Sequence, residues 1–170
     1  MLRTLKQIIR TGLISESPAS GGEDPGGTSK LQARLHRRFG RALAIRHVDA
    51  GSCNGCELEI HAVNNPYYNL EGSGIRFVAS PRHADVLLVT GPVSRHMETA
   101  LKLVYDAMPD PKWVVAVGNC ACTGGVFGVG YASCGSVASV LPVDRVVSGC
   151  PPPPEAILRA VLSVVRTGRK

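Results

Sequence analysis

The chain has 170 residues, of which 44% are hydrophobic and 19% are charged, and its net charge is +6. This length suits one domain with its own core, and no apolar run reaches the roughly 18 to 20 residues of a membrane-spanning helix. With 5% aromatic residues and no recognisable nucleic-acid motif, nucleic acid is the weakest candidate partner for the positive charge.

Residues 1–41 are predicted to form an N-terminal arm. Residues 1–14 place Leu and Ile at helical spacing with Arg and Lys on other faces, which is typical of a short amphipathic helix. This helix could pack on its own domain or dock at a membrane interface. Docking is favoured because residues 15–29 have the Ser, Gly and Pro content of a flexible linker. Residues 30–41 predict a second, basic helix, and the domain proper is expected over residues 42–170.

The N-terminus lacks the apolar stretch and the cleavage site of a signal peptide, so the sequence predicts a protein that stays in the cytoplasm. Cysteines in a reducing compartment are more often metal-binding or catalytic than disulfide-bonded. The six cysteines of this chain therefore point to a site and not to a disulfide framework.

Strands and helices are predicted to alternate along the domain. Continuous apolar runs predict strands at residues 43–48, 75–78, 86–89, 113–117 and 145–147. Helices are predicted at residues 57–63, 93–108, 137–141 and 156–165. Strands that are apolar throughout belong to a parallel sheet covered by helices on both faces. The expected fold class is α/β, a flavodoxin-like open parallel sheet with strand order 2-1-3-4-5.

Three cysteine-containing segments directly follow the first, fourth and fifth predicted strands. They contain the pair Cys53 and Cys56, then Cys120, then Cys150. In open parallel sheets, ligands bind beyond the carboxyl ends of the strands. The predicted strand order brings all three segments to one edge of the sheet, so these cysteines are expected to become neighbours.

Four thiolates are the standard protein shell of a 4Fe–4S cluster, and the gap between Cys53 and Cys56 lets their sulfurs hold different corners of the cube. Gly51 and Gly55 permit tight turns beside the sulfurs. A lone C-x-x-C pair also fits a thioredoxin-like redox pair or half of a zinc site. Zinc is disfavoured because the other two cysteines stand singly, and a redox pair would leave them unexplained. No catalytic residue is predicted; the predicted cofactor ligands are Cys53, Cys56, Cys120 and Cys150.

The two remaining cysteines, Cys122 and Cys134, are predicted to pack as small hydrophobic side chains. Cys122 lies two residues from Cys120 and is the alternative ligand if one of the four assignments is wrong. The histidines of the chain show no metal-ligand pattern.

The residues around the four cysteines resemble a known family. Residues 49–60 are similar to the proximal-cluster loop of small subunits of membrane-bound, energy-converting (group 4) nickel–iron hydrogenases, a group that includes formate hydrogenlyase. Residues 80–85, 89–93, 118–121, 124–127 and 149–152 extend the resemblance, which covers about residues 42 to 162. The same family includes the 20 kDa subunit of respiratory complex I, the NADH-quinone oxidoreductase.

The resemblance implies a subunit of an oxidoreductase complex that does not itself hold the catalytic centre. It would carry one 4Fe–4S cluster and relay electrons between a nickel–iron site in a partner large subunit and clusters of a ferredoxin-like subunit. The N-terminal helix would contact membrane-arm subunits, which implies a peripheral location on the cytoplasmic side of the inner (plasma) membrane. No nucleic-acid partner is expected.

Several positions bear on this resemblance. The complex I subunit has two adjacent cysteines where this chain has a C-x-x-C pair, which favours a hydrogenase small subunit. Asn119 stands where an aspartate is common, and the missing negative charge predicts slightly easier reduction of the cluster. Glu57, Glu59 and Arg82 are expected near the cluster or the large-subunit interface, with Glu59 favoured among them.

Two other classes stay open. One is the cluster subunit of a complex I-like, quinone-reducing enzyme, distinguished by whether the partner large subunit retains its nickel-binding cysteine pairs. The other is a flavodoxin-like binding module with reduced cysteines and no metal.

Overall fold

The computed structural model describes residues 2, 6, 9, 10, 33, 35–37 and 39–166. The four described residues among the first ten are helical, in agreement with the helix predicted there. The rest of that helix, the predicted linker and part of the second basic helix lie outside the described residues. The division of the chain at residue 41 therefore stays a prediction.

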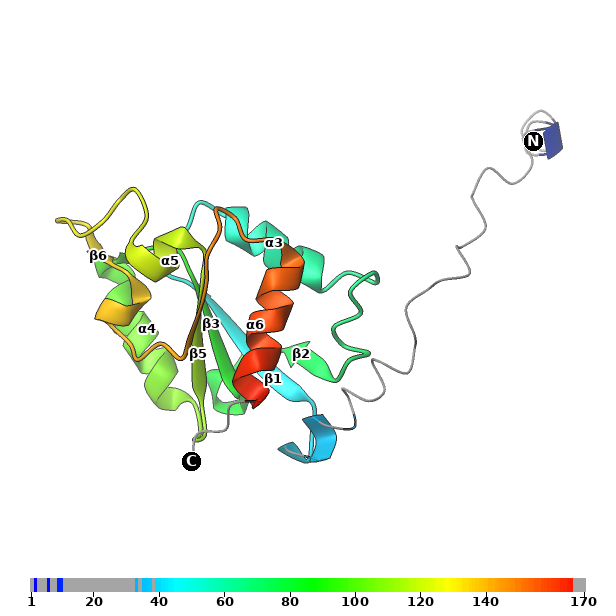
Figure 1. The fold of residues 1–170 in the computed structure, drawn as a ribbon, viewed down its shortest axis with the longest axis horizontal. Coiled ribbons are helices and arrows are strands. Elements are labelled where there is room, and N and C mark those ends of the chain that lie inside the picture. Colours follow the sequence, from blue (N-terminus) through cyan, green and yellow to red (C-terminus); the bar gives the residue numbers. More distant parts are fainter. Residues whose placement is uncertain are drawn as a thin grey trace.

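A five-stranded parallel sheet forms the centre of the domain, with strand order β2-β1-β3-β5-β7 (Figure 1). Its strands are β1 (Leu43–Asp49), β2 (Ile75–Phe77), β3 (Val86–Thr90), β5 (Trp113–Val117) and β7 (Arg145–Val147). Counted among themselves along the chain, these strands have the order 2-1-3-4-5. The predicted flavodoxin-like α/β fold is confirmed, and every predicted strand is present.

Helices cover both faces of the sheet, as expected for strands that are apolar on both sides (Figure 1). The helices α3 (Gly55–Val63) and α6 (Pro154–Arg166) contribute Ile60, Val63, Ile157, Val161 and Val164 to the core on one face. The helices α4 (Arg95–Ala107) and α5 (Asn119–Thr123) contribute Leu101 and Ala121 to the core on the other face. Within β3, Val86 and Leu88 belong to the first core, and Leu87 and Val89 belong to the second.

Three segments differ from their prediction. The helix predicted from residue 93 is preceded by the strand β4 (Val93–Ser94), which pairs antiparallel with β6 (Ser133–Gly135). Helix α4 begins after Ser94 because the Ser94 hydroxyl accepts a hydrogen bond from the Met97 N–H at 3.3 Å. The helix predicted at residues 137–141 is the short 3-10 helix η2 (Val137–Ser139). The segment after β5 that contains Cys120 forms the helix α5, where no helix was predicted.

One further 3-10 helix, η1 (Pro81–His83), immediately precedes β3. Within the described part of the chain, none of the helices combines the length and the apolar character needed to cross a bilayer.

Candidate metal centre

The three cysteine-containing segments begin from one row of paired residues at the carboxyl edge of the sheet. Asp49 at the end of β1 pairs with Thr90, Thr90 pairs with Val117, and Val117 pairs with Val147. The segments with Cys53, Cys120 and Cys150 follow three residues of this row, which are Asp49, Val117 and Val147. Figure 1 shows the outcome, with α3, α5 and the connection into α6 at the same end of the molecule.

The four predicted ligands lie close enough together for their charges to interact. Cys53 and Cys150 are exposed, and Cys56 and Cys120 are half-buried. Burial, followed by the charges of Glu57, Cys53, Cys120 and Cys150, raises the pKa of Cys56 to about 11. Burial and then the charges of Cys150 and Cys53 raise the pKa of Cys120. Four thiolates at this spacing repel one another, and a bound metal group supplies the positive charge that favours the thiolate form.

Two glycines press directly against the sulfurs. A Cβ on Gly118, whose φ is +90°, would lie 2.5 Å from Cys56 Sγ. A Cβ on Gly125, whose φ is +57°, would lie 2.8 Å from Cys120 Sγ. Only glycine combines this backbone conformation with so close an approach. The backbone at Gly118 and Gly125 therefore lies close to these two sulfurs, where the side chain of any other residue would collide with them.

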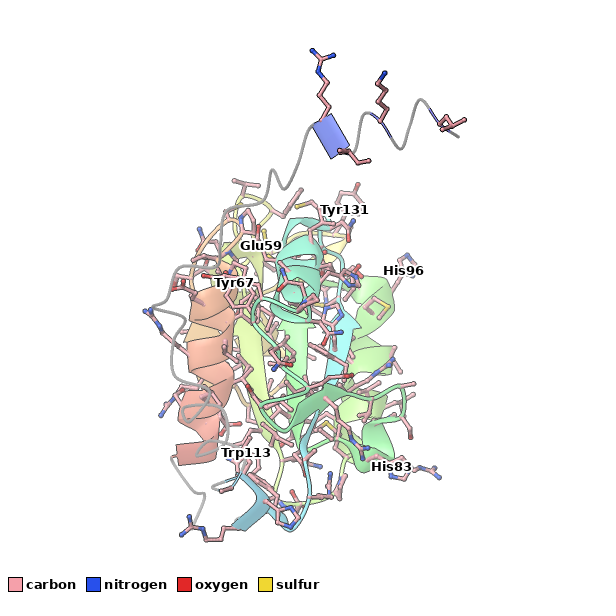
Figure 2. All side chains as sticks on the ribbon, turned by 90° about the vertical axis from the view of Figure 1, so that its right-hand side faces the viewer. Glu59, Tyr67, His83, His96, Trp113 and Tyr131 are labelled. Carbon is pink, nitrogen blue, oxygen red and sulfur yellow. The ribbon has the colours of Figure 1, made fainter. Side chains whose placement is uncertain are left out.

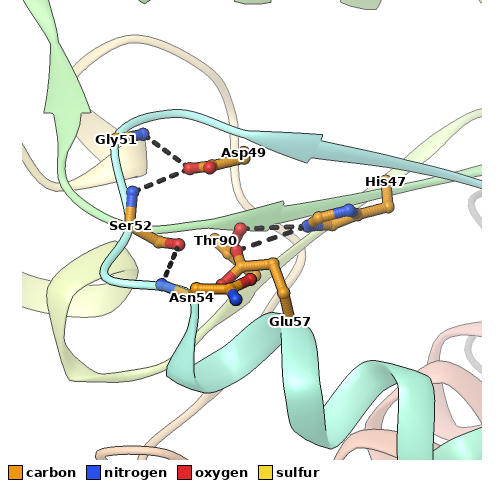
Figure 3. Close-up of polar contacts among 7 residues, drawn as sticks. All are labelled: His47, Asp49, Gly51, Ser52, Asn54, Glu57 and Thr90. Atoms are coloured by element: carbon orange, nitrogen blue, oxygen red, sulfur yellow. Dashed lines mark hydrogen bonds and ion pairs between the residues drawn. The ribbon is translucent and has the colours of Figure 1, made fainter.

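Hydrogen bonds fix the turn that carries Cys53 (Figure 3). Asp49 Oδ1 accepts from the backbone N–H groups of Gly51 at 2.8 Å and Ser52 at 2.7 Å. Ser52 Oγ then accepts from the N–H of Asn54 at 3.1 Å, and Asn54 adopts the left-handed conformation with φ 71°. Helix α3 follows at once, so Cys56 lies in its first turn. Side chains of this segment itself thus order the turn.

The carboxylate of Glu57 points toward His47 and Thr90 on the sheet (Figure 3). Its side chain is buried, and Oε1 lies 3.7 Å from His47 Nε2, which also contacts Thr90 Oγ1 at 3.0 Å. Neither carboxylate oxygen of Glu57 has a hydrogen-bond partner among the described residues. Burial lowers the pKa of His47, although the neighbouring Glu57 and Asp49 oppose the shift. Sequence reasoning assigned His47 no role; the alternation of side chains along β1, which places it on the α3 face, was the available signal.

Glu59 and Arg82, the other two residues expected at the site, lie at opposite ends of the molecule. Glu59 is half-buried on α3, at the same end of the molecule as the cysteines. Arg82 lies in η1, which precedes β3 and therefore occupies the amino edge of the sheet, so the expectation that it lies near the cysteines is wrong. Figure 2 shows this separation, with Glu59 and Tyr131 at one end and the neighbouring His83 at the other. The alternative for Arg82, a place at the large-subunit interface, stays a prediction.

Cys122 and Cys134 face the interior, as expected of small hydrophobic side chains. Cys122 packs against the core on the α4 side, and its Sγ donates weakly toward the Val147 carbonyl at 3.6 Å. Cys134 is 9% exposed, and its Sγ lies 3.3 Å from Glu98 Oε2. Burial raises the pKa of both thiols.

In the described part of the chain, no three Cys, His, Asp or Glu side chains lie close enough to hold a single metal ion. A zinc site needs such a tight tetrahedral shell. A cubane cluster is larger and takes one thiolate at each iron corner.

The fold and this edge define a flavodoxin-like α/β protein whose cysteine-bearing segments share one end of a parallel sheet. The chain belongs to the NADH ubiquinone oxidoreductase 20 kDa subunit family, whose profile matches residues 53–164.

Relatives of the chain are subunits of oxidoreductase complexes, which confirms the predicted class. The probable membrane-bound hydrogenase subunit MbhJ of Pyrococcus furiosus is 48% identical over 133 residues, which cover 78% of this chain and 80% of that protein. An NADH-quinone oxidoreductase subunit of Citrifermentans bemidjiense is 45% identical over 109 residues, and the match covers 64% of each protein.

Among solved structures, a chain of the membrane-bound sulfane sulfur reductase, an archaeal respiratory membrane complex, superimposes with a TM-score of 0.65. It is 30% identical, and the match covers 81% of this chain and 75% of that chain. The family resemblance predicted from the sequence is confirmed.

Proposed function

We propose that this chain is the electron-relay subunit of a membrane-associated, hydrogenase-type complex and holds one 4Fe–4S cluster. The proposed ligands are the sulfurs of Cys53, Cys56, Cys120 and Cys150. The observation that carries the proposal is the gathering of these four thiols at one sheet edge, with backbone glycines pressed against two of the sulfurs.

When bound, the cluster would supply a one-electron carrier. The residues of the chain would hold and shield it. The Asp49 turn orients Cys53, and Gly118 and Gly125 bring backbone to within contact of Cys56 and Cys120. The exposed thiols of Cys53 and Cys150 leave one side of the site open to a partner.

An uncharged, apolar projection beside the site is the proposed contact surface for the large subunit. Residues 118–143 contain no charged residue, and four large side chains in this segment are exposed: Val126 (93%), Phe127 (64%), Val129 (77%) and Tyr131 (100%). Exposed aromatic residues without neighbouring charges are typical of the centre of a protein–protein interface.

This projection, residues 124–132, is held in place by hydrogen bonds. The Gly130 N–H donates to the Ser133 carbonyl at 2.9 Å, and Ser133 Oγ donates to the Gly128 carbonyl at 2.9 Å. Its base touches the site, because Gly125 lies against Cys120 Sγ. A partner that covers the projection would therefore also shield the proposed cluster from water.

The N-terminal helix is the proposed contact with membrane-arm subunits. Among its described residues, Leu2 and Ile9 are 88% and 75% exposed, beside the cations Lys6 and Arg10. An exposed apolar side flanked by cations suits the surface of a membrane complex, which would make the protein peripheral, on the cytoplasmic side. Deletion of residues 1–14 should release the protein into the soluble fraction while the domain stays folded.

The choice of a hydrogenase rests on the C-x-x-C spacing of Cys53 and Cys56. The identity to the NADH-quinone oxidoreductase subunit keeps a complex I-like, quinone-reducing enzyme as the second candidate. Purification of the complex through a tag on this chain separates the two. Nickel in the co-purified large subunit, with hydrogen evolution from a reduced low-potential dye, supports the first. Quinone reduction by a nickel-free complex supports the second.

A further inference from the structure

Asn119 connects two of the cysteine-containing segments through a reciprocal pair of hydrogen bonds. Its backbone N–H donates to the Gly149 carbonyl at 2.8 Å, and its side-chain Oδ1 accepts from the Gly149 N–H at 2.8 Å. Asn119 immediately precedes Cys120, and Gly149 immediately precedes Cys150. The pair therefore sets the separation of two proposed ligands that come from different strands.

The residues around this pair have little freedom to compensate for its loss. The Gly118 N–H donates to the Val147 carbonyl at 2.8 Å, which continues the β5–β7 pairing up to Asn119. A Cβ on Gly149, whose φ is +146°, would lie 2.5 Å from Pro152 Cα, so the chain folds back tightly just before Cys150. A shift at Asn119 would thus be transmitted to the Cys150 segment.

We propose that Asn119 is a positioning residue for the cluster: its side-chain carbonyl holds the Cys150 segment in place without adding charge. The inference rests on the proposed function. An aspartate would accept the same hydrogen bond but would set a negative charge beside the cluster. The amide therefore positions Cys150 through a hydrogen bond and does not lower the reduction potential of the cluster, as a negative charge would.

The test uses the full chain, purified anaerobically with its cluster, and three variants. Asn119→Ala removes the side-chain acceptor, and Asn119→Asp keeps it and adds charge. Ser163→Ala is the control, because Ser163 Oγ donates to the Ala160 carbonyl at 2.7 Å within α6, outside the cysteine-containing segments. The readouts are the rate of iron release to a chelator, the EPR spectrum of the oxidised protein, and the reduction potential.

Asn119→Ala should release iron about fivefold faster, the factor that corresponds to one ordinary hydrogen bond. Loss of the iron held by Cys150 as Fe²⁺, followed by one-electron oxidation with added ferricyanide, should also leave the EPR signal of an oxidised three-iron cluster. Asn119→Asp should release iron at the wild-type rate but have a lower reduction potential. Ser163→Ala should match the wild type in both.

Two results would overturn the inference: wild-type iron release by Asn119→Ala, or rapid release by Asn119→Asp. Circular dichroism identifies a variant that has lost its fold. If Asn119→Ala is unfolded, the inference is decided by the rate of iron release from Asn119→Asp relative to the wild type. Failure of the proposed function looks different, because the wild-type chain itself would then hold no cluster.

Discussion

His47 and Glu57 form a pair beneath the Cys53 turn, with 3.7 Å between His47 Nε2 and Glu57 Oε1. Burial lowers the pKa of His47 below its ordinary value of 6.5 despite the nearby carboxylate. Desolvation by the surrounding protein thus outweighs attraction to Glu57, and the histidine is neutral in the folded protein at neutral pH.

Replacing His47 with Gln should reduce the loss of stability at acidic pH. The unfolded chain binds a proton at His47 near pH 6.5, whereas the folded protein does so only at lower pH. The free energy of unfolding therefore falls as the pH decreases from 6.5 through the folded-state pKa, and His47 contributes no pH dependence above that window. Urea midpoints at about pH 7.5 and about pH 5.5 should differ less for His47→Gln than for the wild type. The same difference in both proteins would contradict this explanation, and the exposed His96, replaced by Gln, is the control.

Gly118→Ala should destabilise the protein and impair the site together. The new methyl group would meet Cys56 Sγ at 2.5 Å, and alanine at φ +90° is strained, which costs about 1–3 kcal/mol. The matched control is Gly130→Ala, because a Cβ at Gly130 would have no atom within 4 Å. The urea midpoint of unfolding and the iron content per chain should both be lower than in the wild type for Gly118→Ala, and both should be unchanged for Gly130→Ala. Equal stability and equal iron content in Gly118→Ala and Gly130→Ala would contradict the close contact between the backbone at Gly118 and Cys56 Sγ.

Phe127→Ser and Tyr131→Ser should weaken binding of the large subunit while the domain stays folded. Each removes an exposed aromatic side chain from the projection, and such residues commonly contribute more than about 1 kcal/mol to an interface. The measurement is the yield of large subunit that co-purifies with the tagged chain. Leu103→Ser is the control, because Leu103 is as exposed as Phe127, at 64%, but lies on α4. Equal losses for the control and the two aromatic variants would contradict the proposed contact surface.

Asp85→Asn should lower stability without changing the cluster. At the amino edge of the sheet, Asp85 Oδ1 accepts from Arg41 Nη2 at 2.7 Å and Oδ2 accepts from the Ala44 N–H at 2.9 Å. Weakening these bonds to a buried carboxylate should cost about 1–3 kcal/mol in the free energy of unfolding. The EPR spectrum of the reduced protein should stay the same, since the cysteines lie at the opposite edge. A changed spectrum would show that the two edges are coupled.

The sheet could be predicted because its strands are buried on both faces and therefore appear as continuous apolar runs. β3 illustrates this, since all of its residues from Val86 to Thr90 are buried. With the strands parallel and in this order, the neighbourhood of Cys53, Cys120 and Cys150 follows from strand direction alone. This is why four cysteines far apart in the sequence could be grouped into one site.

Other features depend on contacts that the local sequence does not encode. The short helix α5 forms around the buried Ala121, and β4 exists only because β6 pairs with it. Arg82 was misplaced because it belongs to a motif of the family resemblance, although its position before β3 already assigned it to the amino edge. The orientation of Glu57 toward His47 required the packing of α3 on β1.

The most direct test of the central claim is iron and sulfide analysis with EPR spectroscopy on the anaerobically purified chain and two cysteine variants. We predict four iron and four sulfide per wild-type chain and the EPR signal of a reduced 4Fe–4S cluster. The same signal is expected in Cys122→Ala, because Cys122 faces the core. Cys150→Ala should lose the normal cluster. An iron-free wild-type chain, or a normal 4Fe–4S signal in Cys150→Ala, would contradict the claim that these four cysteines share one cluster.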